Sequence, residues 1–126
     1  MANELRLSMS HVLKNGNVAH SFNAGDLLFD QTTAKYYEQI ITVGTSEEDI
    51  SFGAEITTAG VVVLRNLEAS GGNFVKYGPK SAGSMIELGR ILPLMPLRLY
   101  IGDSSIILRM VADTASVELQ VITYEV

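Results

Sequence analysis

Apolar residues recur at every second position through most of this chain, and this spacing predicts β-strands rather than helices. The clearest run alternates Leu5, Leu7, Met9 and Leu13 with more polar neighbours. Glycine, asparagine, aspartate and serine interrupt such runs about every eight to twelve residues, which is the spacing of short strands joined by turns. No helical pattern of useful length is present, so the sequence predicts an all-β fold.

Asn15-Gly16 directly follows the first alternating run, and Asn-Gly is the strongest two-residue signal for a β-hairpin. A type I′ turn with these two residues at its centre predicts that His11 lies opposite His20. In the same register the apolar side chains of both strands share one face. The other expected pairs are Lys14 with Asn17, Leu13 with Val18, and Met9 with Phe22.

Short alternating or apolar runs continue to the end of the chain. They predict further strands at residues 36–43, 50–52, 60–67, 74–77, 85–90, 97–101, 106–111 and 117–125. The continuous apolar run at residues 61–64 is typical of a strand buried on both sides. About eight or nine short strands predict one antiparallel β-sandwich domain over residues 1–126, with a jelly-roll-like arrangement.

Residues 97–101 and 106–111 are expected to pair as a hairpin. A loop of Asp103-Ser104 would place Arg98 directly opposite Arg109, and like charges so placed repel. A Gly102-Asp103 loop avoids that contact and puts glycine first, as a type II′ turn requires. The second loop is therefore predicted.

Composition excludes several classes of function. The 126 residues include no cysteine, which removes disulfides, thiolate metal ligands and thiol nucleophiles, and favours an intracellular origin. The net charge of −5 has the wrong sign for a protein that neutralises phosphates, so nucleic acid is not an expected partner. The N-terminus lacks the apolar run of a signal peptide, and no stretch is long enough to span a membrane.

Charge is distributed unevenly along the chain. Residues 38–55 contain acids and no base, whereas residues 76–98 contain four bases and one acid. Opposite charges on one chain suit head-to-tail packing of identical copies into a ring. The alternative is that both are ordinary solvated loop regions, which is the more common role of surface charge.

The predicted His11/His20 pair is the main candidate for metal binding, because directly opposed residues have Cβ atoms about 5 Å apart. A zinc site needs at least a third ligand, and the same face offers only apolar neighbours. A structural histidine pair is therefore favoured, and no metal or cofactor is expected.

No catalytic arrangement stands out. Gly102-Asp103-Ser104 is similar to an esterase nucleophile block, but the expected context is a tight turn between antiparallel strands and no histidine follows it. Residues 78–84 have two glycines at phosphate-loop spacing, yet Ser84 stands where the essential lysine should be. Residues 47–49 are acidic but lack the alternating spacing of a calcium loop. The sequence predicts that the protein is not an enzyme.

The most apolar segment outside a predicted strand is residues 91–97, whose prolines cannot donate to a sheet. Two interpretations remain open: the segment lines the core, or it is an exposed contact surface for another subunit. Under the second interpretation the candidate interface residues are Leu92, Pro93, Leu94, Met95 and Pro96.

The block at residues 60–67, Gly-Val-Val-Val-Leu-Arg-Asn-Leu, resembles small all-β structural proteins of tailed bacteriophages and prophages. Such proteins often follow it with an asparagine and a short strand, which correspond here to Asn73, Phe74 and Val75. The segment 41–45 and the last strand, 117–125, are also similar to theirs. Glu68 replaces their usual aspartate, and residues 70–72 differ from their usual turn.

This resemblance implies a non-enzymatic virion protein, made in the bacterial cytoplasm, that acts as a capsid decoration or cement protein. Its implied partners are the major capsid protein or other virion proteins, and it is expected to be a homo-oligomer. A minor tail or head-tail connection protein is the alternative within the same class. An alternative of another class is a small β-sandwich that binds a ligand or glycan.

Overall fold

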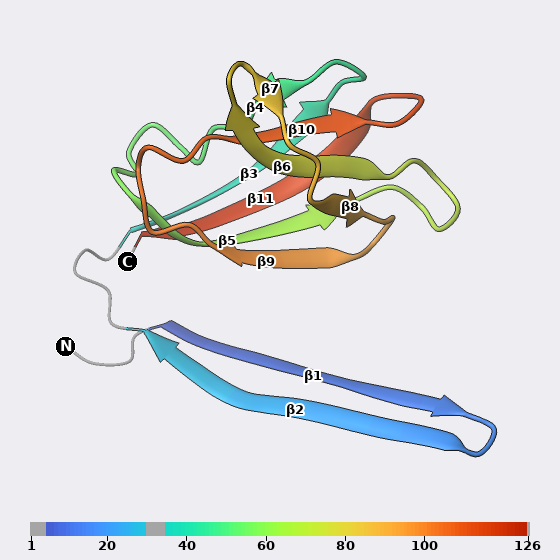
Figure 1. Cartoon of the computed structure of the whole chain (residues 1–126). Coiled ribbons are helices and arrows are strands. Elements are labelled where there is room, and N and C mark those ends of the chain that lie inside the picture. The colour runs from blue at the N-terminus through green and yellow to red at the C-terminus, as the bar shows by residue number, and fades with distance from the viewer. Residues whose placement is uncertain (1–4, 30–34, 126) are drawn as a thin grey trace. The chain divides into compact units, whose positions relative to one another are not determined.

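The computed structural model describes residues 5–29 and 35–125, which form eleven strands and no helix (Figure 1). The strands are β1 (Leu5–Asn15), β2 (Val18–Phe29), β3 (Tyr36–Val43), β4 (Glu48–Asp49), β5 (Ala59–Asn66), β6 (Val75–Ser81), β7 (Ser84–Met85), β8 (Gly89–Ile91), β9 (Pro96–Tyr100), β10 (Leu108–Ala112) and β11 (Val117–Glu125). All strand pairs are antiparallel. The predicted all-β class is confirmed.

The chain divides into two compact units, residues 1–33 and residues 34–126. We call them the hairpin unit and the sandwich unit and describe each by itself. The sequence predicted one domain over residues 1–126. The buried core cluster is built from side chains between Val43 and Val121, all in the sandwich unit.

The hairpin unit is a long two-stranded ribbon of β1 and β2, and its predicted register is wrong. The two-residue loop is Gly16-Asn17 instead of Asn15-Gly16, so His11 lies opposite Phe22 and Leu13 lies opposite His20. Only the first loop residue has positive φ, +57° at Gly16, which is the requirement of a type II′ turn. Glycine at the first position therefore determines the turn.

The register error shifts the pairing by two residues, and a two-residue shift leaves every side chain on its original face. The predicted grouping of apolar side chains on one face is thus retained. Near the open end, the pairing shifts again between Ser8 and Ser10, where an irregularity in β2 holds Gly25 at φ +71°.

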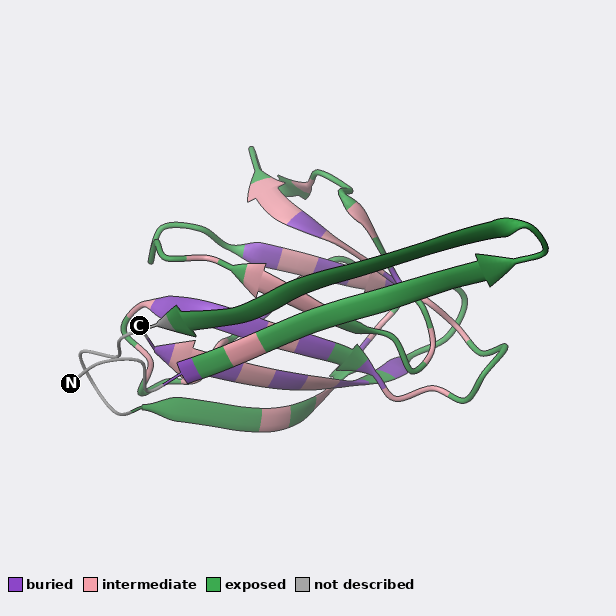
Figure 2. Ribbon diagram, turned by 90° about the horizontal axis from the view of Figure 1, so that it is seen from below, coloured by how far each residue is buried: buried purple, intermediate pink, exposed green. Residues whose placement is uncertain are grey.

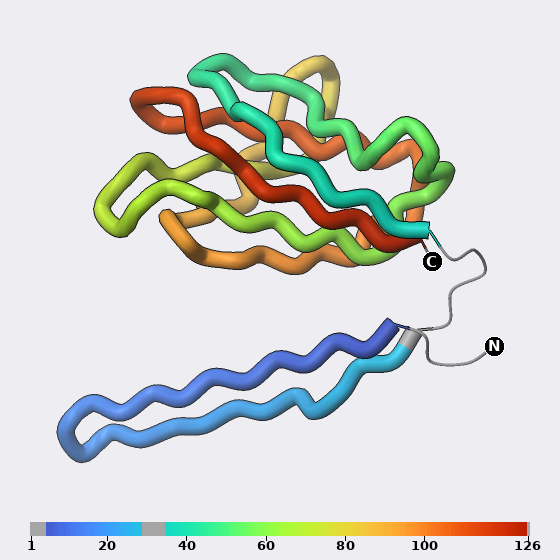
Figure 3. The backbone as a smooth tube through the Cα atoms, turned by 180° about the vertical axis from the view of Figure 1, so that it is seen from behind, coloured from blue at the N-terminus to red at the C-terminus, as the bar shows by residue number. Residues whose placement is uncertain are grey.

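The sandwich unit consists of two packed sheets. One has the strand order β3-β11-β5-β9, and the other has the order β4-β10-β6-β7, with β8 also paired to β6. Along the tube in Figure 3, the chain crosses repeatedly from one sheet to the other. Core side chains come from both sheets, including Leu64 and Leu119 from the first and Ile91 and Met110 from the second. The predicted β-sandwich is confirmed.

Burial alternates along the central strands, as Figure 2 shows by colour. In β11, Val117, Leu119 and Val121 are buried, whereas the residues between them are more exposed. In β5 the predicted double-sided burial is largely observed, since Val61, Val62 and Leu64 are all buried. The strands predicted at 36–43, 60–67 and 117–125 correspond closely to β3, β5 and β11.

The hairpin predicted from residues 97–101 and 106–111 is wrong. β9 pairs with β5 in the first sheet, whereas β10 pairs with β4 and β6 in the second. Both segments bury alternating side chains in one core, Leu97 and Leu99 from one side and Leu108 and Met110 from the other. They consequently face each other across the core instead of lying side by side.

Two shorter predictions also need correction. The strand expected at 50–52 is displaced to β4, although the Ile50 amide still donates to the Leu108 carbonyl at 2.9 Å. The strand expected at 85–90 is divided into β7 and β8. Both halves run along β6, and the pairing shifts by one residue between them. Between them, the Ile86 carbonyl lies directly over Gly78, where no side chain could be accommodated.

Candidate protein interaction surfaces

Residues 92–96, which we call the apolar turn, lead from the end of β8 in one sheet into the first residue of β9 in the other. Leu92, Leu94 and Met95 are all exposed. The turn has a defined backbone: Leu94 has φ +63° and donates its amide to the Asn66 carbonyl at 2.8 Å. The Met95 amide donates to the Leu92 carbonyl at 3.0 Å. The segment was expected either to line the core or to form an exposed contact surface, and the exposure of these side chains matches the second interpretation.

A left-handed backbone at leucine is unfavourable, because its Cβ crowds the following carbonyl. Such conformations persist where surrounding contacts impose them, and they are frequent at functional positions. Here the contact is to Asn66, a fully buried residue, so the apolar turn is anchored to the core at its centre. The turn therefore presents its apolar side chains in a preorganised form.

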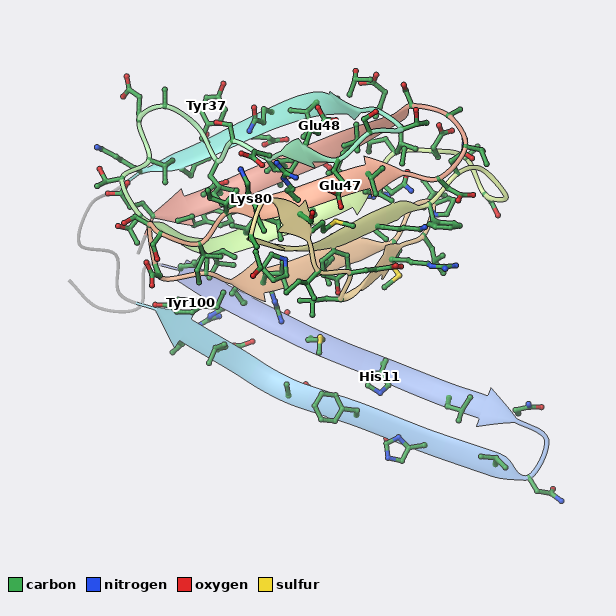
Figure 4. All side chains as sticks on the ribbon, turned by 45° about the horizontal axis from the view of Figure 1, so that its top comes forward. His11, Tyr37, Glu47, Glu48, Lys80 and Tyr100 are labelled. Atoms are coloured by element: carbon green, nitrogen blue, oxygen red, sulfur yellow. The ribbon has the colours of Figure 1, made fainter. Side chains whose placement is uncertain are left out.

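A cluster of opposite charges lies on the second sheet, where Figure 4 labels Glu47 and Lys80. Arg109 on β10 donates to Asp49 at 2.7 Å, to Glu47 at 3.3 Å and to the Gly83 carbonyl at 2.8 Å. Lys80 on β6 donates to the other oxygen of Asp49 at 3.3 Å. Hydrogen bonding by Arg109 lowers the pKa of the Asp49 carboxyl, and the same contact raises the pKa of Arg109.

This cluster joins the acidic stretch and the basic stretch whose opposite charges suit head-to-tail packing. Asp49 of the acidic region contacts Lys80 of the basic region within the chain, and Glu47 of the acidic region contacts Arg109. Glu47 also accepts a hydrogen bond from the Met85 amide at 3.1 Å. These charges are thus largely used to hold β4, β6, β7 and β10 together.

The two histidines do not form the predicted direct pair. Their ring centroids are 6.5 Å apart, and His11 instead stacks on Phe22 at 5.1 Å. Within residues 5–29 and 35–125, no group of three or more histidine, aspartate and glutamate side chains is placed to hold a metal ion. The same described residues include no helix of a length and hydropathy suited to crossing a membrane.

The other sequence motifs serve as turns. Asp103 accepts hydrogen bonds from the backbone amide and the hydroxyl of Ser105, at 2.8 and 2.7 Å. The hydrogen bond from the backbone amide is the main cause that lowers the pKa of the Asp103 carboxyl. This Asx-type turn redirects the chain between the sheets. The glycine-rich stretch 78–84 forms the end of β6 and its tight turn into β7, with no helix after it.

A row of three tyrosines and one valine on the first sheet was not predicted from the sequence. Tyr36, Tyr124, Val61 and Tyr100 are neighbours in register across β3, β11, β5 and β9. They lie on the outer face, because they alternate with the core-facing positions of these strands. The rings of Tyr36 and Tyr124 are 6.3 Å apart, and Tyr36 and Tyr100 are 68% and 61% exposed. We call this set the tyrosine row.

No local signal identifies the tyrosine row, since its members are separated by up to 88 positions, from 36 to 124, and meet only through long-range strand pairing. Comparisons of the chain with protein-family models, curated proteins and solved structures found no match. The candidate surfaces therefore have to be interpreted from their own chemistry.

Proposed function

We propose that this protein is a non-enzymatic structural component of a bacteriophage virion, a capsid decoration or cement protein that strengthens the shell through protein contacts. The sequence resemblance at residues 60–67 supports the virion setting. The observation that carries the proposal is the apolar turn, which presents exposed leucine and methionine side chains on an anchored backbone. Rigid apolar anchors are typical of interface centres.

The apolar turn would act as the contact to the major capsid protein or another virion protein. Asn66, which belongs to the resembling block, is also the residue that anchors the turn. The block and the contact surface are thereby connected in one physical arrangement. Burying two such side chains contributes about 3 kcal/mol or more, which corresponds to roughly a hundredfold in affinity.

The test compares binding of purified protein to virions that lack it. We expect wild-type protein to bind the shell and raise the temperature at which particles break. Leu92→Asp combined with Met95→Asp should weaken binding about a hundredfold. Ile106→Asp is the matched control, because Ile106 and Met95 are both 41% exposed but lie in different loops.

Unchanged binding by the double variant would contradict a role for the apolar turn. Electron microscopy of the same virions then decides the position of the protein. Density confined to the tail or to the head-tail junction, with shells of normal resilience in its absence, would replace the decoration role by the minor tail or connector alternative.

A second candidate function is ligand or glycan binding, favoured by a depression of about 380 Å³ in the sandwich unit. Its lining combines two aromatic rings, Tyr36 and Tyr37, with the charged residues Lys35 and Glu55. Aromatic surfaces with a few polar groups are typical of small-molecule sites. A glycan-array signal that Tyr36→Ala abolishes, at one ligand per chain, would favour this candidate over the virion role.

A further inference from the structure

The hairpin unit has one apolar face and one polar face. On the polar face Arg6 pairs with Asp26 at 3.5 Å, among serine and lysine neighbours. Strand alternation and the observed register place the apolar set on the opposite face. The exposed apolar members of this face are Met9, Leu13, Val18, Phe22 and Leu27, and the exposed rings of His11 and His20 lie among them.

An isolated two-stranded ribbon is only marginally stable in water, and a large exposed face rich in apolar side chains marks a contact surface. The hairpin therefore needs a covering partner to persist as a long ribbon. On the outer face of the first sheet of the sandwich unit, the tyrosine row offers a matching apolar surface. In the adjacent row Ile122 and Val63 lie between Glu38 and Arg98.

The area of the ribbon indicates which arrangement of copies can be stable. Strands of 11 and 12 residues extend about 36 to 40 Å, and two strands are about 10 Å wide. One face of the hairpin therefore covers roughly 350 to 400 Å². Two hairpins packed face to face would bury only this much per chain, about half of the roughly 800 Å² per partner in a standard interface.

Reciprocal exchange doubles the buried area. If each chain supplies a hairpin and also receives one on its sheet, it buries roughly 700 to 800 Å², which is within the range of stable complexes. Three strands of eight or nine residues and one strand of five offer a face of roughly 450 to 500 Å², sufficient to accept most of the ribbon. The area thus favours hairpin-on-sheet exchange over hairpin-on-hairpin packing.

We propose that the β1–β2 hairpin is an exchange arm whose apolar face packs on the tyrosine row and outer sheet face of a second copy of this chain. The arrangement closes either as a two-fold dimer or as a ring, since each copy gives and receives one arm. This inference concerns self-assembly and stands whether or not the protein belongs to a virion.

Chemical crosslinking tests the contact directly, because the chain has no native cysteine to interfere. Phe22→Cys chains are mixed with Tyr100→Cys chains and treated with a short bismaleimide. We expect mixed dimers to exceed either homodimer severalfold. The matched control replaces Phe22→Cys with Ser21→Cys, on the opposite face of the same strand, and should give few mixed dimers.

Sedimentation measures assembly independently. We expect the wild-type chain to be dimeric or larger at micromolar concentration, and Leu13→Glu to weaken association at least tenfold. Val12→Glu is the control: Val12 is 77% exposed against 49% for Leu13 and lies on the polar face. A circular dichroism spectrum that matches the wild type shows that each variant keeps its sandwich unit.

Three outcomes overturn the proposal. A wild-type chain that stays monomeric well above micromolar concentration removes self-assembly. Dominant Phe22→Cys homodimers mean that hairpins pack on each other. Crosslinking within single monomeric chains of the Phe22→Cys/Tyr100→Cys double variant means that the arm covers its own sheet. None of these results bears on binding to virions through the apolar turn, so the two proposals fail separately.

Discussion

The side-chain amide of Asn66 donates a hydrogen bond of 3.0 Å to the carbonyl of Ile91, which connects β5 of one sheet to β8 of the other. The same amide donates to the Asn73 carbonyl at 2.9 Å, and its oxygen accepts from the Glu68 amide at 2.9 Å. Every polar atom of this fully buried side chain thus has a partner. Asn66 joins the two layers and supports the apolar turn.

We predict that Asn66→Ala lowers the free energy of unfolding by about 2 to 4 kcal/mol, since it leaves buried backbone groups without partners. Urea denaturation measures the change. Asn73→Ala is the control: its side chain makes an exposed hydrogen bond with Thr114, and its loss should cost less than about 1 kcal/mol. Equal losses in both variants would contradict the role assigned to Asn66.

Strands with a full alternating pattern could be predicted from sequence, and β3 and β11 are the best examples. The bounds of β4, β7 and β8 could not, because strands of two or three residues are defined by the neighbour they pair with. Strands adjacent in the chain were also expected to pair. β9 and β10 lie in different sheets instead, because each strand buries its apolar side chains in the same core from opposite sides.

The candidate surfaces were predictable to different degrees. The apolar turn was found because prolines and leucines are contiguous, although sequence alone left its exposure open. The tyrosine row depends on registers among four strands that are distant in the chain, and no local pattern encodes such registers. In the hairpin, the choice between Asn15-Gly16 and Gly16-Asn17 as the loop is a balance between two glycine-containing turn types.

Close packing at Gly78 gives a second prediction. A Cβ atom at this position would lie 1.7 Å from the Ile86 carbonyl oxygen, so β6 and the segment between β7 and β8 would have to separate. Gly78→Ala should therefore destabilise the sandwich unit by about 3 kcal/mol or more. Gly44→Ala is the control, because a methyl group at that position would meet no atom within 4 Å. Thermal unfolding of both variants distinguishes them.

At Thr123 we predict a substitution that stabilises the chain, in contrast to those at Asn66 and Gly78. Its hydroxyl is fully buried on β11, and it finds no hydrogen-bond partner among the described residues. Burying an unpaired hydroxyl costs about 1 to 3 kcal/mol. Thr123→Val should thus raise the free energy of unfolding, by about 1 kcal/mol. Thr42→Val, which removes an exposed 2.7 Å bond to Glu118, should not stabilise the chain. A destabilised Thr123→Val would indicate that the hydroxyl is satisfied.

The ion pair between Asp49 and Arg109 predicts a specific dependence of stability on pH. The hydrogen bond from Arg109 lowers the pKa of Asp49 in the folded chain, so the folded state favours the ionised carboxylate. A group with a lowered folded pKa stabilises fully above its unfolded pKa, about 4, and this contribution is lost as the pH falls through the folded value.

We therefore expect Asp49→Asn to be less stable than the wild type at pH 7, and the difference between them to shrink as the pH falls below about 4. Melting temperatures across this range measure the difference. Because the Asp49 side chain is about half exposed (48%), added salt should also reduce the stability difference at pH 7. The Arg109→Met variant should show the same narrowing, since it removes the cation that favours the ionised carboxylate. A difference that stays constant from pH 7 to pH 3 would mean that Asp49 contributes through packing instead of through its charge.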